Sequence, residues 1–345
     1  MTPTTTRRRG LLITAGAGVA FAAGGRPALA APEKPSLELA VGGKPLLYYL
    51  PLTLAEQLGY FKEEGLDVRV SDFQGGAKSL QALMGGSADI VTGAYDHTIQ
   101  KQAKRQPIVA ICELGRFPGI VLAVRKAKVA DYKGPESLKG WRVGVTAPGS
   151  STSFMVSYFL TRHGMRPEDV SFVAVGGGPS AVAAVKQGAV DAIANLDPVI
   201  SQLESAGDVQ VIADSRTAEG TTEVYGGGYP AAVVYARRDF LASNPETAQA
   251  VVNAFVRTLK WMDGASAAEI AGKVPEAYLA GDAALYRTAL AESKAMYSKD
   301  GRLDMAAAEN ALKVLAAFDP AVRSALIDLA ATWDGRFVEA AHKRA

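Results

Sequence analysis

The chain contains the same glycine-bearing segment twice, and this repeat constrains its fold more than any other feature. Residues 75–89 and residues 177–191 align without a gap and share a leading pair of glycines, an alanine, a later glycine and a final aspartate. The paired glycines permit a tight turn. The apolar spacing after them is that of a short helix, which Gly86 or Gly188 ends. Two structural units of the same kind are therefore expected in one chain.

Apolar strands are predicted on both sides of each copy. They contain many β-branched residues and cover 66–70, 88–92, 170–175 and 190–194, with earlier strands at 37–41 and 141–145. A strand, a helix and another strand in this order favour parallel pairing through a right-handed crossover. The predicted fold class is α/β, with two Rossmann-like lobes.

Two further apolar segments are expected to cross between the lobes and to form a two-strand hinge. Residues 119–125 would leave the first lobe, and residues 229–236 would return to it. The predicted domains are 31–123 plus 229–345 for lobe 1, and 124–228 for lobe 2. From Asn244 onward the pattern is helical, including Ala-rich segments at 265–274, 282–297 and 305–317, and these helices are expected to pack on lobe 1.

Residues 1–30 are predicted to be an export signal and not part of the fold. Three arginines precede a short apolar run, and Ala28-Leu29-Ala30 is typical of a cleavage site, so cleavage is expected after Ala30. The run is shorter than the roughly 18 to 20 residues that span a bilayer. The pair Arg8-Arg9 and the later Arg26 favour twin-arginine export over general secretion. The expected location is periplasmic.

Composition excludes several other classes of protein. Cys112 is the only cysteine, so the chain has no internal disulfide and depends on its core for stability; an apolar neighbourhood predicts that Cys112 is buried. Loss of the four arginines in residues 1–30 makes the charge balance slightly negative. A near-neutral protein without basic clusters is a poor candidate for binding nucleic acid or for stable association with a membrane.

Several segments together resemble the nitrate/sulfonate/taurine group of ABC-importer solute-binding proteins (the SsuA/TauA/NrtA type). They are residues 54–68, 74–76, 88–91, 138–145 and 148–152, and the likeness covers nearly the whole chain after residue 30. The resemblance implies a type II periplasmic-binding-protein fold with a ligand in the cleft between the lobes. It also implies delivery to an ABC permease driven by a cytoplasmic ATPase. A monomer without a cofactor or metal is expected.

Ligands of α/β sheets bind beyond the carboxyl ends of the strands, and this rule selects equivalent loops in both lobes. Arg116 is added as a possible charge and Tyr225 as a possible aromatic wall. The predicted ligand-binding residues are Tyr48, Tyr49, Gln74, Gly75, Gly76, Tyr95, Asp96 and Arg116 in lobe 1, and Ser150, Ser151, Thr152, Gly177, Asn195, Asp197 and Tyr225 in lobe 2.

The predicted ligand is a small anion that resembles a sulfonate, taurine or nitrate. Free backbone amides at the helix starts near Gly76 and Ser151 favour negative charge, and the neighbouring hydroxyls add donors. Asp96 and Asp197 oppose this prediction, because a carboxylate in the cleft repels an anion. The alternative is therefore a neutral or amine-bearing heterocycle such as a pyrimidine precursor.

Enzymatic function receives little support from the sequence. The spacings His-x-x-x-His, Cys-x-x-Cys and Gly-x-Ser-x-Gly are all missing from it, so neither zinc chemistry nor a hydrolase nucleophile is indicated. Desulfinases and a pyrimidine-precursor synthase use a similar fold, but the synthase's cysteine-rich signature is not present here. A sensor domain of a signalling receptor is a further alternative, which the lack of a fused kinase or membrane segment disfavours.

Overall fold

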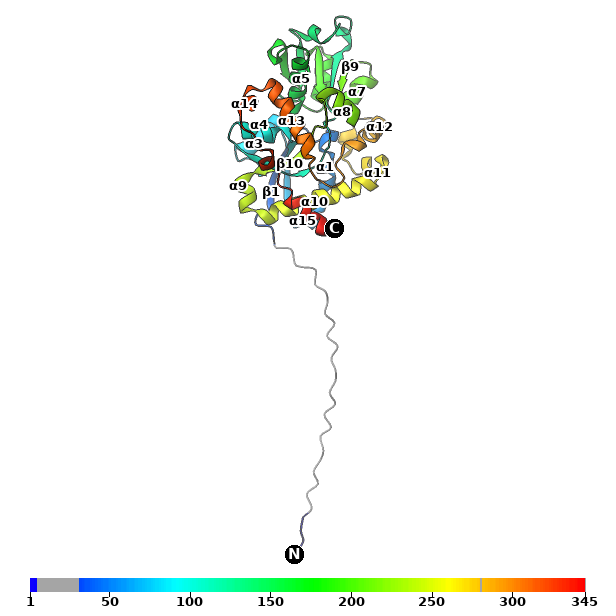
Figure 1. Cartoon of the computed structure of the whole chain (residues 1–345). Coiled ribbons are helices and arrows are strands. Elements are labelled where there is room, and N and C mark those ends of the chain that lie inside the picture. Colours follow the sequence, from blue (N-terminus) through cyan, green and yellow to red (C-terminus); the bar gives the residue numbers. More distant parts are fainter. Residues whose placement is uncertain (5–30, 280, 345) are drawn as a thin grey trace. The chain divides into compact units, whose positions relative to one another are not determined.

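The computed structural model describes residues 1–4, 31–279 and 281–344, and residues 31–345 form one compact unit (Figure 1). The predicted twin-arginine signal and the cleavage position after Ala30 fall outside the described residues. Within the described part of the chain, no helix combines the length and apolarity needed to cross a membrane.

The first sheet has the strand order β2-β1-β3-β10-β4. Strands β1 and β2, and likewise β1 and β3, pair in parallel, whereas β10 runs antiparallel to both of its neighbours. All residues of β3 and β4 are buried, as expected for strands covered on both faces. The bounds are β1 Ser36–Val41, β2 Asp67–Asp72, β3 Ile90–Ala94, β4 Ile108–Glu113 and β10 Ala232–Arg237.

The second sheet repeats this arrangement in the order β7-β6-β8-β5-β9, with β5 as the antiparallel strand. Its strands are β5 Val121–Arg125, β6 Arg142–Val145, β7 Ser171–Ala174, β8 Ala192–Asn195 and β9 Val209–Asp214. The prediction of two α/β lobes of the same kind is confirmed. The antiparallel strand of each lobe, β10 in lobe 1 and β5 in lobe 2, begins directly after the chain has crossed from the other lobe.

The predicted lobe boundary after residue 123 is wrong by a few residues. All of β5 pairs with β8 and β9, so Val121, Leu122 and Ala123 belong to lobe 2. An apolar strand leaving one lobe has the same sequence pattern as one entering the next, and only its hydrogen-bond partners distinguish the two cases. The crossing segments are therefore 114–120, between β4 and β5, and 226–231, before β10.

Helices cover both sheets, and Figure 1 places α5 and α7 at one end of the compact unit and α10 and α15 at the other. In lobe 1 they are the 3-10 turn η1 Leu47–Tyr49, α1 Leu50–Gln57, α2 Tyr60–Glu63, α3 Gly76–Met84 and α4 Asp96–Ala103. In lobe 2 they are α5 Ser151–Arg162, α6 Pro179–Lys186, α7 Val199–Ser205 and α8 Ala218–Tyr225. The later helices are α9 Arg238–Ser243, α10 Pro245–Gly264, α11 Ala267–Ala271, α12 Ala283–Ser293, α13 Met305–Phe318, α14 Pro320–Ser324 and α15 Arg336–Arg344.

The C-terminal helices contact both lobes, which corrects the expectation that they pack on lobe 1 alone. Helix α10 packs on α1, α2 and β4 of lobe 1, as expected. Helix α12 packs on α7, and α13 packs on α5 and α8 as well as on α4 of lobe 1. The small side chains of Ala307, Ala308 and Ala311 are buried along α13. Because these side chains are small, helices of both lobes can pack closely against α13.

The repeated aspartates explain one part of the sequence duplication. Asp89 Oδ2 accepts a hydrogen bond from the backbone of Glu38 at 3.0 Å, and Asp191 Oδ2 accepts one from the backbone of Arg142 at 3.0 Å. In both lobes the aspartate just before the third parallel strand therefore ties that strand to the first parallel strand, β1 in lobe 1 and β6 in lobe 2. The carboxylates have the same structural role in the two lobes.

Candidate functional site

A cavity with about 320 Å³ of empty space, including its open mouth, lies where loops of the two lobes meet. Lobe 1 and Ile120, in the crossing segment 114–120, supply an aromatic and apolar wall, and lobe 2 supplies hydroxyl groups. None of the lining residues is a lysine, arginine, aspartate or glutamate. They are Gly42, Leu46, Tyr48, Tyr49, Gly76, Ala94, His97, Ile120, Thr146, Ser150, Ser151, Thr152 and Leu196.

The duplicated glycines lie where one lobe approaches the other. A Cβ atom on Gly75 would be 2.8 Å from the Cβ of Ala147, and a Cβ on Gly177 would be 2.7 Å from Leu46 Cδ1. Both distances are below any normal carbon–carbon contact. A side chain at either position would therefore collide with the other lobe, so glycine permits the two lobes to approach each other closely. Both glycine turns face the space between the lobes.

Three hydrogen bonds join the start of α5 in lobe 2 to the starts of α3 and α4 in lobe 1. The Ala77 amide donates to Ser150 Oγ at 2.9 Å, and Ser151 Oγ donates to Asp96 Oδ2 at 2.6 Å. His97 Nε2 lies 3.3 Å from the carbonyl oxygen of Gly149, which can only accept. These bonds hold the hydroxyl wall against the aromatic wall.

The histidine tautomer follows from its two contacts. Because Nε2 donates to the Gly149 carbonyl, Nδ1 is left to accept from the Tyr235 hydroxyl, 3.3 Å away. Burial lowers the pKa of His97, although Asp96 acts in the opposite direction. The neutral imidazole is the form that fits both partners.

Asp96 is buried beside the cavity, with only 1% of its surface exposed. Its Oδ2 atom accepts from Ser151 and, at 3.2 Å, from the hydroxyl of Tyr229. Its Oδ1 atom has no hydrogen-bond partner among the described residues. Burial raises the pKa of Asp96 above 3.8, although His97, Ser151 and Tyr229 oppose the shift. Burial also raises the pKa of Tyr48 and of Tyr49, and the nearby Asp96 raises both further.

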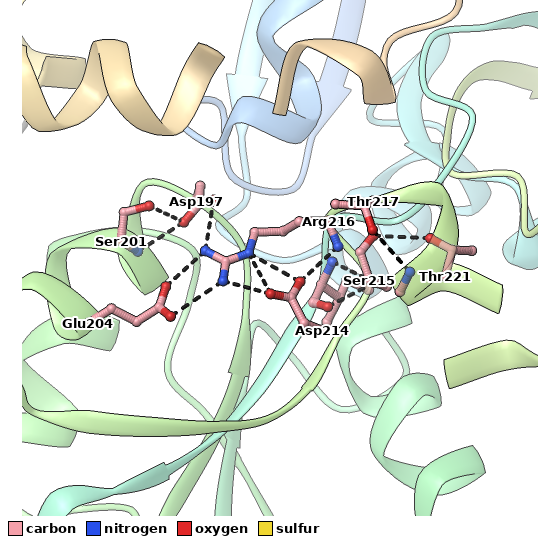
Figure 2. A network of polar contacts seen from close by, with 10 residues as sticks. Asp197, Ser201, Glu204, Asp214, Ser215, Arg216, Thr217 and Thr221 are labelled. Atoms are coloured by element: carbon pink, nitrogen blue, oxygen red, sulfur yellow. Dashed lines mark hydrogen bonds and ion pairs between the residues drawn. The ribbon is translucent and has the colours of Figure 1, made fainter. Parts of the chain in front are cut away.

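Asp197 occupies the matching position in lobe 2, since both aspartates follow the end of the third parallel strand by two residues. Its Oδ1 atom accepts from Ser201 N at 2.9 Å and from Ser201 Oγ at 2.6 Å, and its Oδ2 atom is 3.6 Å from Arg216 Nη1. Burial raises the pKa of Asp197, while Ser201 and Arg216 lower it. The predicted cleft carboxylate of Asp197 therefore belongs to a network within lobe 2 (Figure 2).

Arg216 is the centre of that network. Its guanidinium contacts Glu204 at 2.8 Å and Asp214 at 2.7 Å as well as Asp197 (Figure 2). The backbone oxygen of Asp197 accepts from the Leu47 amide of lobe 1 at 2.9 Å. The network thus fixes a lobe 2 loop that touches the loop carrying the tyrosine wall.

The structure brings six of the predicted ligand-binding residues to the cavity wall. They are Tyr48, Tyr49, Gly76, Ser150, Ser151 and Thr152. Two others, Gly75 and Gly177, lie at the contact between the lobes without lining the cavity. The exposed side chain of Gln74 faces Gly176 of lobe 2.

Four more of the predicted residues also lie off the lining, each for an identifiable reason. The Tyr95 hydroxyl is 2.7 Å from Thr332 Oγ1 inside lobe 1. Asn195 donates to the Gly176 carbonyl and accepts from the Leu196 amide. Tyr225 stacks between Tyr229 and Tyr158, with ring centroids 4.3 Å and 6.1 Å away. Arg116 is exposed to solvent.

The prediction omitted several residues that line the cavity. Gly42 and Thr146 follow the first strand of each lobe, so the strand-end rule would have found them if it had been applied to β1 and β6. His97 is adjacent to Asp96 in the selected loop. Leu196 likewise lies between Asn195 and Asp197, whereas Leu46, Ala94 and Ile120 have no sequence signal that separates them from ordinary core residues.

Two five-stranded sheets of the same mixed topology, with a cavity between their loops, define the fold of periplasmic binding proteins. A solved structure from Bordetella bronchiseptica RB50 is 50% identical, covers 91% of this chain and 98% of its own, and has a TM-score of 0.88. The alkanesulfonate-binding protein SsuA from Xanthomonas axonopodis pv. citri, bound to MOPS, is 20% identical with a TM-score of 0.65, over 87% and 98% of the two chains. The nitrate-binding protein NrtA from Synechocystis PCC 6803 is 17% identical with a TM-score of 0.67, over 91% and 90%.

The family model of the NMT1-like family matches residues 30–274, and the chain belongs to this family. A protein of Bacillus subtilis (strain 168), provisionally named binding protein YtlA, is 24% identical over 73% of this chain and 74% of its own. A 4-amino-5-hydroxymethyl-2-methylpyrimidine phosphate synthase from Aspergillus parasiticus is 28% identical over 62% and 63%, less than two thirds of its length.

Proposed function

We propose that the chain is the extracytoplasmic solute-binding component of an ABC importer and captures a small solute between its lobes. The observation that carries this proposal is the division of the cavity wall between two lobes whose sheets are joined by the crossing segments 114–120 and 226–231. Closing such lobes on a ligand buries it on all sides, and opening them releases it. The names of SsuA and NrtA, which share the fold, support the same reading.

The partners in this proposal are a membrane permease and its cytoplasmic ATPase, and the chain acts as a monomer. Export by the twin-arginine route with cleavage after Ala30 would leave residues 31–345, which match the compact unit. The arginine pair at residues 8 and 9 supports this route.

Binding without catalysis fits the chemistry of the cavity, although relatives at 28% identity and below are named as synthases. Both nitrogens of His97 are engaged by Gly149 and Tyr235, so the histidine is not poised as a free base. Cys112 is fully buried in β4, and burial raises the pKa of its thiol, which disfavours the reactive thiolate.

Two ligand classes follow from the two walls. A small oxyanion such as a sulfonate or nitrate would take hydrogen bonds from the hydroxyl wall of Ser150, Ser151 and Thr152. An amine-bearing heterocycle is the second candidate, favoured by the tyrosines, by Asp96 and by a lining without lysine or arginine.

The test combines ligand screening with uptake. Thermal melting of the purified protein is measured with ethanesulfonate, taurine, nitrate and aminopyrimidines, since a ligand at a hundredfold excess over Kd stabilises by about 2.7 kcal/mol. Deleting the gene should abolish uptake of the stabilising compound. Intact uptake with loss of only a signalling response would instead identify a receptor, and conversion of the compound by the purified protein would identify an enzyme.

A further inference from the structure

Two loops of lobe 1 reach the space between the lobes and contribute residues to the cavity wall. The loop after β1 contains Gly42 and Leu46, and the turn after β2 leads to Gly76 at the start of α3. The two loops touch each other, because a Cβ atom on Gly42 would be 2.3 Å from the Gly76 amide nitrogen. Leu46 is also the residue that a side chain at Gly177 of lobe 2 would meet. The shape of these loops therefore determines how lobe 1 meets lobe 2.

Asp72, the last residue of β2, bonds to the backbone of both loops. Its Oδ1 atom accepts from the Gly43 amide at 2.8 Å and from the Gln74 amide at 2.9 Å. Its Oδ2 atom accepts from the Lys44 amide at 3.1 Å. Hydrogen bonds to an ionised carboxylate are stronger than those between neutral groups. One side chain that does not line the cavity thus joins the two loops that do.

Gln74 has an unfavourable backbone conformation, and its amide donates to this carboxylate. Its φ is 56°, in the left-handed region, where a residue with a Cβ atom is strained. Its side chain faces lobe 2, since a Cβ atom on Gly176 would be 3.4 Å from Gln74 Oε1. Strained residues persist where their surroundings hold them, and they concentrate at ligand-binding sites. The bond to Asp72 offsets part of the strain at this position.

The equivalent turn of lobe 2 is held by neutral groups. When the alignment of the two repeats is extended toward the N-terminus, Asp72 corresponds to Ala174, the last residue of β7. In place of a carboxylate, the Thr146 carbonyl accepts from the Gly176 amide at 3.2 Å. Asn195 Nδ2 also donates to the Gly176 carbonyl at 2.9 Å. The carboxylate that organises these loops is therefore a feature of lobe 1 that lobe 2 does not repeat at the matching position.

We propose that Asp72 is a positioning residue for solute binding, which holds the loops after β1 and β2 in the shape that meets lobe 2. This inference rests on the proposed function and deepens it by naming the group that preforms the lobe 1 half of the site. Asp72 is exposed to solvent, so water can replace its bonds to the amides when its side chain is removed. The loss should therefore affect the order of the loops, and with it solute affinity, more than the stability of the fold.

The first experiment measures amide hydrogen exchange by NMR on the purified protein. In Asp72→Ala the amides of Gly43, Lys44 and Gln74 should exchange about tenfold faster or more, because their acceptor is gone. Amides in the buried strand β3 should keep their wild-type rates, which separates lost positioning from a general loss of stability. Asp67→Ala is the matched control, since Asp67 is an exposed aspartate at the other end of β2, and it should leave all these rates unchanged.

The second experiment measures affinity by calorimetry for ethanesulfonate, taurine, nitrate and 4-aminopyrimidine. Each compound that binds the wild type should bind Asp72→Ala about tenfold more weakly or worse, because the loops must now be ordered on binding. Asp72→Asn keeps one acceptor oxygen and should lose affinity by an intermediate factor. Asp67→Ala should bind as the wild type does.

Unchanged exchange of the three amides, or unchanged affinity in Asp72→Ala, would overturn the inference. Faster exchange in β3 as well would also overturn it, because the effect would then be one on global stability. Failure of all four compounds to bind would overturn the ligand classes given above, and normal uptake after gene deletion would overturn the proposed function. In both of these cases the exchange rates would still decide whether Asp72 holds the loops.

Discussion

The two lobes share one backbone plan and use it for different chemistry. The plan places an aspartate two residues beyond the third parallel strand in each. In lobe 2 that aspartate is neutralised by Arg216 within a network that fixes a loop, and in lobe 1 it lies beside the cavity with one oxygen unpartnered. The duplicated backbone thus places equivalent loops of both lobes around one cavity, whereas the side chains at equivalent positions have different partners. A buried polar group without a hydrogen-bond partner is expected mainly at functional sites.

The largest expected effect is on stability and concerns Arg216→Met in lobe 2. Removing the guanidinium leaves Asp197 buried without a cation, which should reduce the free energy of unfolding by about 3–5 kcal/mol in urea denaturation. Arg302→Met is the matched control, because its pair with Glu339 is about half exposed and should contribute less than about 1 kcal/mol. Equal losses in the two variants would contradict a special role for the lobe 2 network.

Closure of the lobes should be more sensitive to Gly75 than to Gly178. The methyl group of Gly75→Ala would press against Ala147 of lobe 2 and should cost about 1–3 kcal/mol in the closed form. That cost corresponds to a loss of roughly 5- to 150-fold in affinity for the compound that stabilises the wild type in the melting screen, measured by calorimetry. Gly178→Ala has space for its methyl group and should bind normally; a similar loss there would mean that the contact between the lobes is not the cause.

The repeated aspartates that tie the strands should both matter, with Asp191 the stronger. Asp191→Asn loses charge-assisted bonds from the backbone and the guanidinium of Arg142, and should cost about 1.5–2 kcal/mol. Asp89→Asn should cost about 1 kcal/mol, because Asp89 has one backbone bond and a half-exposed lysine partner. Urea denaturation at neutral pH compares the two, and a larger loss for Asp89→Asn would reverse the expected order.

The Asp191 effect should also depend on pH. Burial raises the pKa of Asp191, but the bonds from Arg142 outweigh it and leave the pKa below 3.8. A lowered pKa in the folded state means stability that is present above about pH 3.8 and is lost as the pH falls through the folded-state pKa. The difference between Asp191→Asn and the wild type should therefore shrink in acid.

The smallest expected effect has the opposite sign and concerns Asp96→Asn without ligand. Because burial raises the pKa of Asp96, its ionisation opposes folding, and this cost grows as the pH rises through the folded-state pKa. The variant should gain about 0.5–1 kcal/mol at pH 7, a typical gain when a functional strain is removed. The gain should vanish below about pH 3.8, where the carboxyl is protonated in both states. A loss of stability at pH 7 would contradict the inference that ionised Asp96 destabilises the folded protein.

Much of the fold could be predicted because it depends on patterns along the chain. Repeated glycines, β-branched runs and helix stops predicted two units with the same succession of strands and helices. Residues after strand ends included the tyrosines of η1 and the hydroxyl-bearing residues at the start of α5. Those positions follow from local geometry, since a strand of a parallel sheet ends at a known edge.

The remaining features of the site depend on hydrogen bonds and ion pairs between residues that are distant in sequence. The pattern of residues along the chain does not show these contacts. Tyr95 and Asp96 are adjacent in the sequence, yet the first side chain reaches Thr332 and the second borders the cavity. Nothing in the sequence distinguishes Asp96 from Asp197 until the fold brings Arg216 to one of them. Apolar spacing reports that a residue is buried, whereas hydrogen bonds and charge pairing depend on which residues the tertiary structure places around it.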